Sequence, residues 1–92
     1  MSTNSKNPDI LEKIEKAYTG FSKGQKKIAD YIMSNYDKAA FMTAAVLSET
    51  TKVSCSTVVR FAFELGYDGY PGFQKALQEV VRTKLTSVQR ME

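Results

Sequence analysis

Three helix-boundary signals lie close together in the middle of this chain and restrict its fold more than any other feature of the sequence. Thr43 precedes one short apolar segment, Ser54 precedes a second, and Gly66 follows the second. Threonine and serine are favoured helix N-caps, and glycine supplies the left-handed residue that often ends a helix. The sequence therefore predicts two short helices, residues 44–51 and 55–65, joined by a tight turn.

Two helices that cross steeply at a short turn are held together by a few inward side chains at fixed offsets. The apolar residues at such offsets are Leu47, Val53, Val58, Phe61, Ala62 and Leu65. Ser48 is small where the helices approach most closely, and Lys52 occupies a turn position where glycine would cost least. This spacing favours a helix-turn-helix, although a plain pair of short helices in a bundle would show a similar pattern.

Further helices are predicted on both sides of this pair. Residues 9–18 carry apolar side chains at helical spacing, and residues 22–35 begin with a Ser-x-x-Gln capping box. We expect residues 36–42 to form a short connection. A proline at the first helical position favours a last helix over residues 71–84. The predicted fold is an all-α bundle of about five helices that contains a helix-turn-helix.

The length of the chain, 92 residues, is that of one domain, and 42% hydrophobic with 25% charged residues is an ordinary globular composition. We expect residues 1–8 to be a flexible leader and residues 9–84 to be the folded domain. Residues 85–92 would be a tail or the start of a linker to a missing domain. Because no apolar run approaches roughly 18 residues and no signal peptide is evident, we expect a cytoplasmic chain without a membrane contact.

Composition also weighs against several kinds of site. The chain has one cysteine and no histidine, so neither an internal disulfide nor a zinc site is expected. We find no catalytic constellation and no Gly-rich phosphate loop, and we expect no enzyme activity, cofactor or metal. A net charge of +3 favours a polyanionic partner without identifying it.

The outward face of the second helix is the candidate binding surface. At about 100° per residue, an inward Val58 leaves Ser56, Val59, Arg60 and Phe63 outside. Ser56 and Arg60 are one turn apart in the N-terminal half, where a recognition helix contacts base edges. Arg60 can grip guanine or clamp a phosphate, and both roles stay open. We expect Phe63 to be covered by the last helix or a second subunit, with contact to thymine methyl groups as the alternative.

Other candidate contacts are to phosphates. Thr43 and Ser54 mark helix N-termini whose free N–H groups attract anions, and Lys52 lies in the turn between the helices. A cluster of three lysines at residues 23–27 begins an earlier helix. For this cluster a solvated face is the favoured interpretation, and contact with the DNA backbone is the alternative.

Three stretches of the chain carry a more specific pattern: QKKIADYIMSN at residues 25–35, MTAAVL at 42–47 and VSCSTVVRFAFELGYDGYPGF at 53–73. They closely resemble the N-terminal domain of RpiR-type bacterial transcriptional regulators. The resemblance implies a helical bundle with an embedded helix-turn-helix and a homodimer on double-stranded operator DNA. It also implies a following sugar isomerase (SIS) domain, absent from this chain, that senses a phosphorylated sugar.

The resemblance carries DNA-reading positions over to Ser54, Ser56, Thr57 and Arg60, with Lys52 in the turn. The chain departs from the family pattern at Lys52, where glycine is frequent, at Ser48, where alanine is usual, and at Phe63, where a polar residue is common. We therefore expect a sequence-specific DNA-binding domain of a bacterial regulator of sugar metabolism. The alternative is a helical protein-protein interaction or dimerisation module that binds no DNA.

Overall fold

The described residues form five α-helices and one short 3₁₀ turn. The computed structural model describes residues 10–91, with side chains described to residue 83. In chain order the elements are α1 (Ile10–Ala17), a 3₁₀ turn (Tyr18–Gly20), α2 (Lys23–Ala39), α3 (Ala44–Thr51), α4 (Cys55–Glu64) and α5 (Tyr70–Met91). The expected all-α bundle of about five helices is confirmed.

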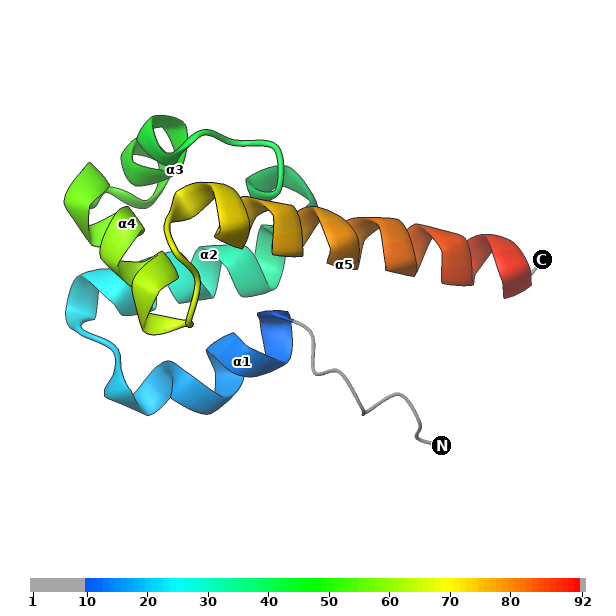
Figure 1. Ribbon diagram of the computed structural model, residues 1–92, viewed down its shortest axis with the longest axis horizontal. Coiled ribbons are helices and arrows are strands. Elements are labelled where there is room, and N and C mark those ends of the chain that lie inside the picture. Colours follow the sequence, from blue (N-terminus) through cyan, green and yellow to red (C-terminus); the bar gives the residue numbers. More distant parts are fainter. Residues whose placement is uncertain (1–9, 92) are drawn as a thin grey trace.

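The helices α1 to α4 gather around the first half of α5, and the second half of α5 projects beyond them (Figure 1). This projection makes the molecule 41 Å long and only 23 and 22 Å across. No helix in the described part of the chain is long and apolar enough to cross a membrane.

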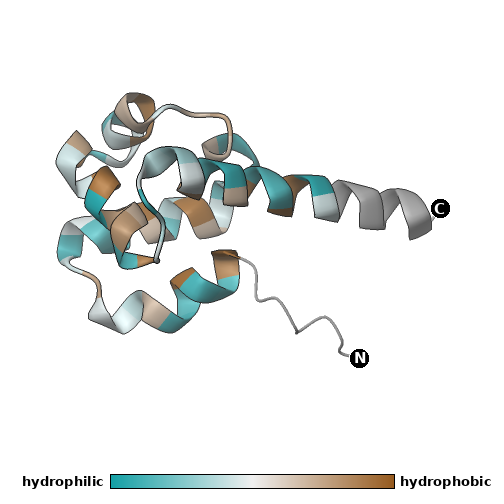
Figure 2. Ribbon diagram, in the orientation of Figure 1, coloured by the Kyte–Doolittle hydropathy of each residue, from teal (hydrophilic) through white to brown (hydrophobic). Residues whose placement is uncertain are grey.

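The core lies where the helices meet, with Phe61 of α4 near its centre. The Phe61 ring centroid is 4.9 Å from that of Phe21 and 5.8 Å from that of Phe73, and all three side chains are buried. Figure 2 shows hydrophobic segments on α4 and on parts of α1 and α2. The aliphatic residues that complete the core are mainly Ile10, Ile14, Ile28, Ile32, Leu47, Val58 and Leu77. Burial of each such side chain contributes about 1.5–3 kcal/mol before the entropic costs of folding.

The start of α2 is where the sequence predicts it, but its predicted end near residue 35 is wrong. Ser22 and Gln25 form the expected capping box, with reciprocal hydrogen bonds of 3.2 and 2.9 Å. Asn35 leaves helical geometry, with φ −137° and ψ 45°, yet the helix resumes and continues to Ala39. Ala39 is fully buried, so packing in the core extends a segment whose own apolar pattern is weak.

The connection between α2 and α3 is tied to α5 by side-chain donors. Gln78 Nε2 donates to the Ala40 carbonyl at 3.0 Å, and both the Tyr70 hydroxyl and Gln74 Nε2 donate to the Met42 carbonyl, at 2.7 and 3.0 Å. These bonds satisfy carbonyls of the connection that directly follows α2, where no helical partner is available. Burial raises the pKa of Tyr70 to about 12, and its hydrogen bond requires the same protonated hydroxyl.

Two other predicted boundaries are corrected. The first helix ends at Ala17 and continues as a 3₁₀ turn, so it does not reach residue 18 as an α-helix. The last helix continues to Met91 and does not end near residue 84, so its backbone marks no boundary between the expected domain and the expected tail. The expected leader, residues 1–8, lies outside the described residues.

Candidate nucleic-acid interface

The turn between α3 and α4 has the geometry of a Schellman motif. The Lys52 N–H donates to the Glu49 carbonyl at 3.3 Å, and the Val53 N–H donates to the Ser48 carbonyl at 2.9 Å. Lys52 is left-handed, with φ 62° and ψ 43°. The same motif ends α4 at Gly66, with φ 96°. The turn thus has the left-handed lysine that the sequence predicts, at a cost of about 1–2 kcal/mol relative to glycine.

The inward side chains hold α3 and α4 together as the spacing predicts. Leu47 on α3 and Val58 and Phe61 on α4 are buried, and Val53 packs half-buried against the core. Ser48 is only 7% exposed, and its hydroxyl donates to the Ala45 carbonyl at 2.7 Å. A larger side chain at Ser48 would force the helices apart.

Both predicted N-caps are present. The Thr43 hydroxyl accepts a hydrogen bond from the Val46 N–H, and the Ser54 hydroxyl accepts one from the Thr57 N–H, each at 3.2 Å. Other N–H groups of these first turns have no acceptor within the helix. Such groups and the helix dipole together favour an anion at the start of α4, beside the cation of Lys52.

The exposed face of α4 carries the predicted reading residues. Ser56 and Arg60 are exposed, whereas Val58 between them is buried, so the orientation predicted from the spacing is correct. Arg60 forms no ion pair with a described residue, although Glu64 lies one turn further along the helix. Lys52 and Ser54 are exposed at the start of this face. The guanidinium of Arg60 is therefore available to an external acceptor.

The other two predicted residues have different surroundings. Thr57 is half-buried, and its hydroxyl lies 2.9 Å from that of Ser54, so it supports the N-cap. Thr43 is the N-cap of α3, at the opposite end of that helix from Lys52 and about 13 Å from it along the axis. The structure thus places Ser56 and Arg60 on the exposed side of α4, and it places Lys52 and Ser54, both exposed, in the turn that leads into this helix. Thr57 is half-buried beside Ser54, and Thr43 lies at the far end of α3.

Phe63 is not covered by the last helix, so this half of the expectation is wrong. Its side chain is 55% exposed. Five residues after Val58, a helical position is rotated about 140° from the buried side, so α5 packs against another face of α4. A second subunit and a thymine contact both remain as roles for Phe63.

Sequence reasoning missed the part played by Gly24, on α2. A Cβ atom at this position would lie 3.3 Å from Thr57 Cγ2 and 3.6 Å from Val53 Cγ1. The beginning of α2 therefore packs directly against the turn and the start of α4. The one signal in the sequence is a glycine within the first turn of a predicted helix. Because glycine lowers helix propensity, its presence there indicates that another segment packs closely against this position.

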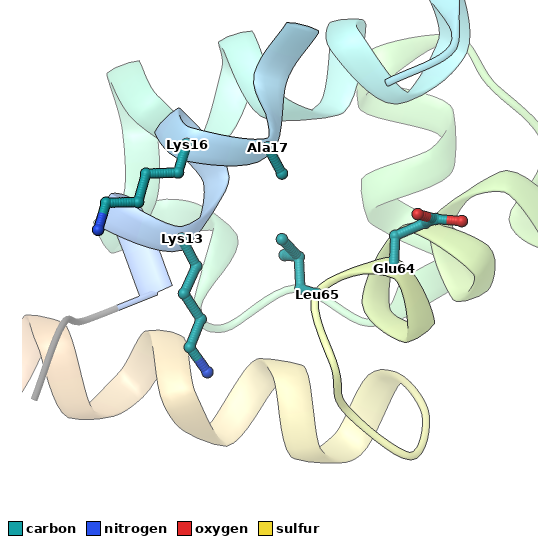
Figure 3. A pocket seen from close by; sticks show the side chains of 5 residues that line it. All are labelled: Lys13, Lys16, Ala17, Glu64 and Leu65. Atoms are coloured by element: carbon teal, nitrogen blue, oxygen red, sulfur yellow. The ribbon is translucent and has the colours of Figure 1, made fainter. Parts of the chain in front are cut away.

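A depression lies beside the C-terminal end of α4. It is lined by Lys13, Lys16, Ala17, Glu64 and Leu65. Ala17 and Leu65 point toward each other across it, whereas the charged ends of Lys16 and Glu64 point away (Figure 3). The Lys13 ammonium lies 3.3 Å from the Tyr67 hydroxyl. We interpret this depression as a seam between α1 and α4.

Comparison with known proteins agrees with this geometry. The family model described as "Helix-turn-helix domain, rpiR family" matches residues 8–84. The chain belongs to the rpiR family of helix-turn-helix domains. Among rpiR relatives, the uncharacterized HTH-type transcriptional regulator YfhH of Escherichia coli (strain K12) is 36% identical over 74 residues, which is 80% of this chain and 26% of YfhH.

Two further similarities connect this rpiR domain to named regulators. The HTH-type transcriptional regulator HexR of Pseudomonas aeruginosa is 33% identical over 63 residues, 68% of this chain and 22% of HexR. The solved structure of Vibrio vulnificus NanR complexed with ManNAc-6P is similar, with a TM-score of 0.78 and 31% identity, over 90% of this chain and 32% of NanR. The chain thus spans about a quarter to a third of the proteins it resembles.

Proposed function

We propose that this chain binds double-stranded operator DNA as the reading domain of a bacterial transcriptional regulator of sugar metabolism. The observation that carries the proposal is the amphipathic character of α4. One side buries Val58 in the core, and the other side exposes Ser56 and Arg60, following the turn that contains Lys52. In this arrangement α4 enters the major groove, Arg60 and Ser56 meet base edges, and Lys52 and the N-terminus of α4 bind phosphates.

The sugar and the oligomeric state belong to the same proposal. NanR is complexed with ManNAc-6P in its solved structure, and it extends well beyond the part that this chain matches. We propose that a phosphorylated sugar acts through a domain outside this chain, and that the regulator is a cytoplasmic homodimer without enzyme activity. A dimer of this kind contacts two half-sites about 34 Å apart, which corresponds to one turn of B-DNA.

The decisive test uses a duplex selected from a random pool by the wild-type chain. Arg60→Ala should weaken binding to this duplex by about 5- to 150-fold, the equivalent of ~1–3 kcal/mol, if Arg60 reads a base. The matched control is Arg82→Ala on α5, where Arg82 pairs with Glu79 at 2.8 Å. It should bind like the wild type. Equal affinity of wild type and Arg60→Ala would exclude this role for Arg60.

A protein-protein interaction module remains the second candidate, because Phe63 and Phe41 are 55% and 69% exposed. Exposed aromatic side chains are frequent anchors of such interfaces. Sedimentation of the chain with and without the selected duplex separates the two functions. An apolar module predicts association without DNA that Phe63→Ala abolishes, together with the absence of any selected duplex.

A further inference from the structure

The packing of α2 against the helix-turn-helix suggests a second group of DNA contacts. Gly24 lies against Thr57 and Val53, so the first turn of α2 adjoins the start of α4. In Figure 1 both helices begin at the same end of the molecule, away from the projecting end of α5. Two lysines in the first two turns of α2, Lys23 and Lys27, are therefore close to the surface assigned above to phosphate binding.

The three lysines at the start of α2 have different surroundings. At about 100° per residue, Lys23 and Lys27 lie about 100° and about 60° from Gly24 on one flank of the helix, and the buried Ile28 lies on the other. Lys26 is about 160° from Gly24, and its ammonium lies 5.4 Å from the centre of the Tyr18 ring. This arrangement is a cation–π contact within the chain. Lys26 thus faces the 3₁₀ turn at residues 18–20, away from the turn between α3 and α4.

Local charges leave Lys23 and Lys27 available to an outside partner. Both side chains are exposed, and neither forms an ion pair with a described residue. Asp30, one turn beyond Lys27, accepts a hydrogen bond from the Tyr18 hydroxyl at 2.9 Å. That bond directs the Asp30 carboxylate toward the 3₁₀ turn, so Lys26, Asp30 and Tyr18 form one group and Lys23 and Lys27 stand apart from it.

We propose that Lys23 and Lys27 bind backbone phosphates of the duplex whose groove receives α4, and that Gly24 brings them within reach. The inference rests on the proposed DNA-binding function and adds contacts from a helix outside the helix-turn-helix. Lysine is a strongly hydrated point charge that suits phosphate better than base edges. These contacts therefore fix the orientation of α4 and add affinity without adding sequence preference.

Salt dependence provides the test, because each phosphate contact contributes about 0.9 to the steepness of log K against log salt for B-DNA. The probe is the duplex selected by the wild-type chain, titrated by fluorescence anisotropy. In Lys23→Gln/Lys27→Gln the steepness should fall by about 1.8. The ratio of wild-type affinity to variant affinity should therefore decrease about tenfold as salt rises from ~50 to ~200 mM. Preference for the selected duplex over a scrambled one should not change.

The matched control is Lys16→Gln/Lys38→Gln, which removes the same charge from exposed lysines on α1 and at the far end of α2. It should keep the wild-type steepness, and circular dichroism should confirm equal folding of both variants. If Lys23→Gln/Lys27→Gln binds like wild type, or if both double variants lose the same steepness, this inference is overturned and the proposed function stands. If the wild-type chain selects no duplex at all, both are overturned.

Discussion

Replacing Lys52 by glycine is expected to stabilise the chain while weakening its binding to DNA. Lys52 is the left-handed residue of the turn, with φ 62°, whereas the equivalent position after α4 is occupied by Gly66. Both turns have the same pair of backbone hydrogen bonds. The change to glycine therefore removes backbone strain and an exposed cation but leaves the hydrogen-bond pattern of the turn intact.

The size of the effect follows from two opposing terms. A left-handed conformation costs a residue with a Cβ atom about 1–2 kcal/mol. The additional freedom of glycine in the unfolded chain offsets about 0.4–1 kcal/mol of this gain. At the midpoints of these two ranges, a net stabilisation of about 0.8 kcal/mol remains. For a domain of this size it corresponds to an increase of roughly 3–6 °C in the melting temperature.

Thermal unfolding followed by circular dichroism, together with salt-dependent titration of the selected duplex, would measure both effects. The matched control is Lys52→Gln, which removes the charge but keeps the strained backbone. It should melt close to the wild type. Both variants should lower the steepness of salt dependence by about 0.9. A Lys52→Gly protein that melts at or below the wild-type temperature would refute the argument from strain.

The remaining predictions concern α4 and the start of α5. Phe61→Ala should cost about 3–5 kcal/mol in urea unfolding because Phe61 is fully buried, whereas Phe63→Ala, at a side chain 55% exposed, should stay within about 0.5 kcal/mol. An equal loss for both would contradict the assigned orientation of α4. Because the pKa of Tyr70 in the folded chain, about 12, is above its ordinary value of 10.0, its contribution to stability should be complete below pH 10 and lost as the pH rises toward 12. In urea unfolding across this range, Tyr70→Phe should lose less free energy of unfolding at alkaline pH than the wild type does. An equal loss in both proteins would mean that other groups cause it.

Local signals in the sequence were sufficient for the helix-turn-helix. The caps Thr43 and Ser54, the terminator Gly66 and the left-handed Lys52 all have the predicted geometry. These features depend on residues close together in the chain. The orientation of α4 followed equally well, because helical periodicity alone places Val58 and Arg60 on opposite sides.

Features that depend on distant contacts were not predictable in the same way. The end of α2 is fixed by burial of Ala39 and by hydrogen bonds such as that from Gln78 to the Ala40 carbonyl, and neither leaves a local pattern. The favoured interpretation of the lysines at residues 23–27 as one solvated face treated them as equivalent. Contact of Gly24 with the turn separates them, and only the packed structure contains that contact.

The central claim, that the exposed face of α4 reads a DNA groove, is tested most directly by nuclear magnetic resonance. The labelled chain would be titrated with the selected duplex while the backbone amides and the Arg60 Nε–H are followed. We predict the largest shifts at Arg60 and along residues 52–60, with small shifts along α1. Shifts confined to Phe63, Phe41 and α5, with none at Arg60, would contradict the claim.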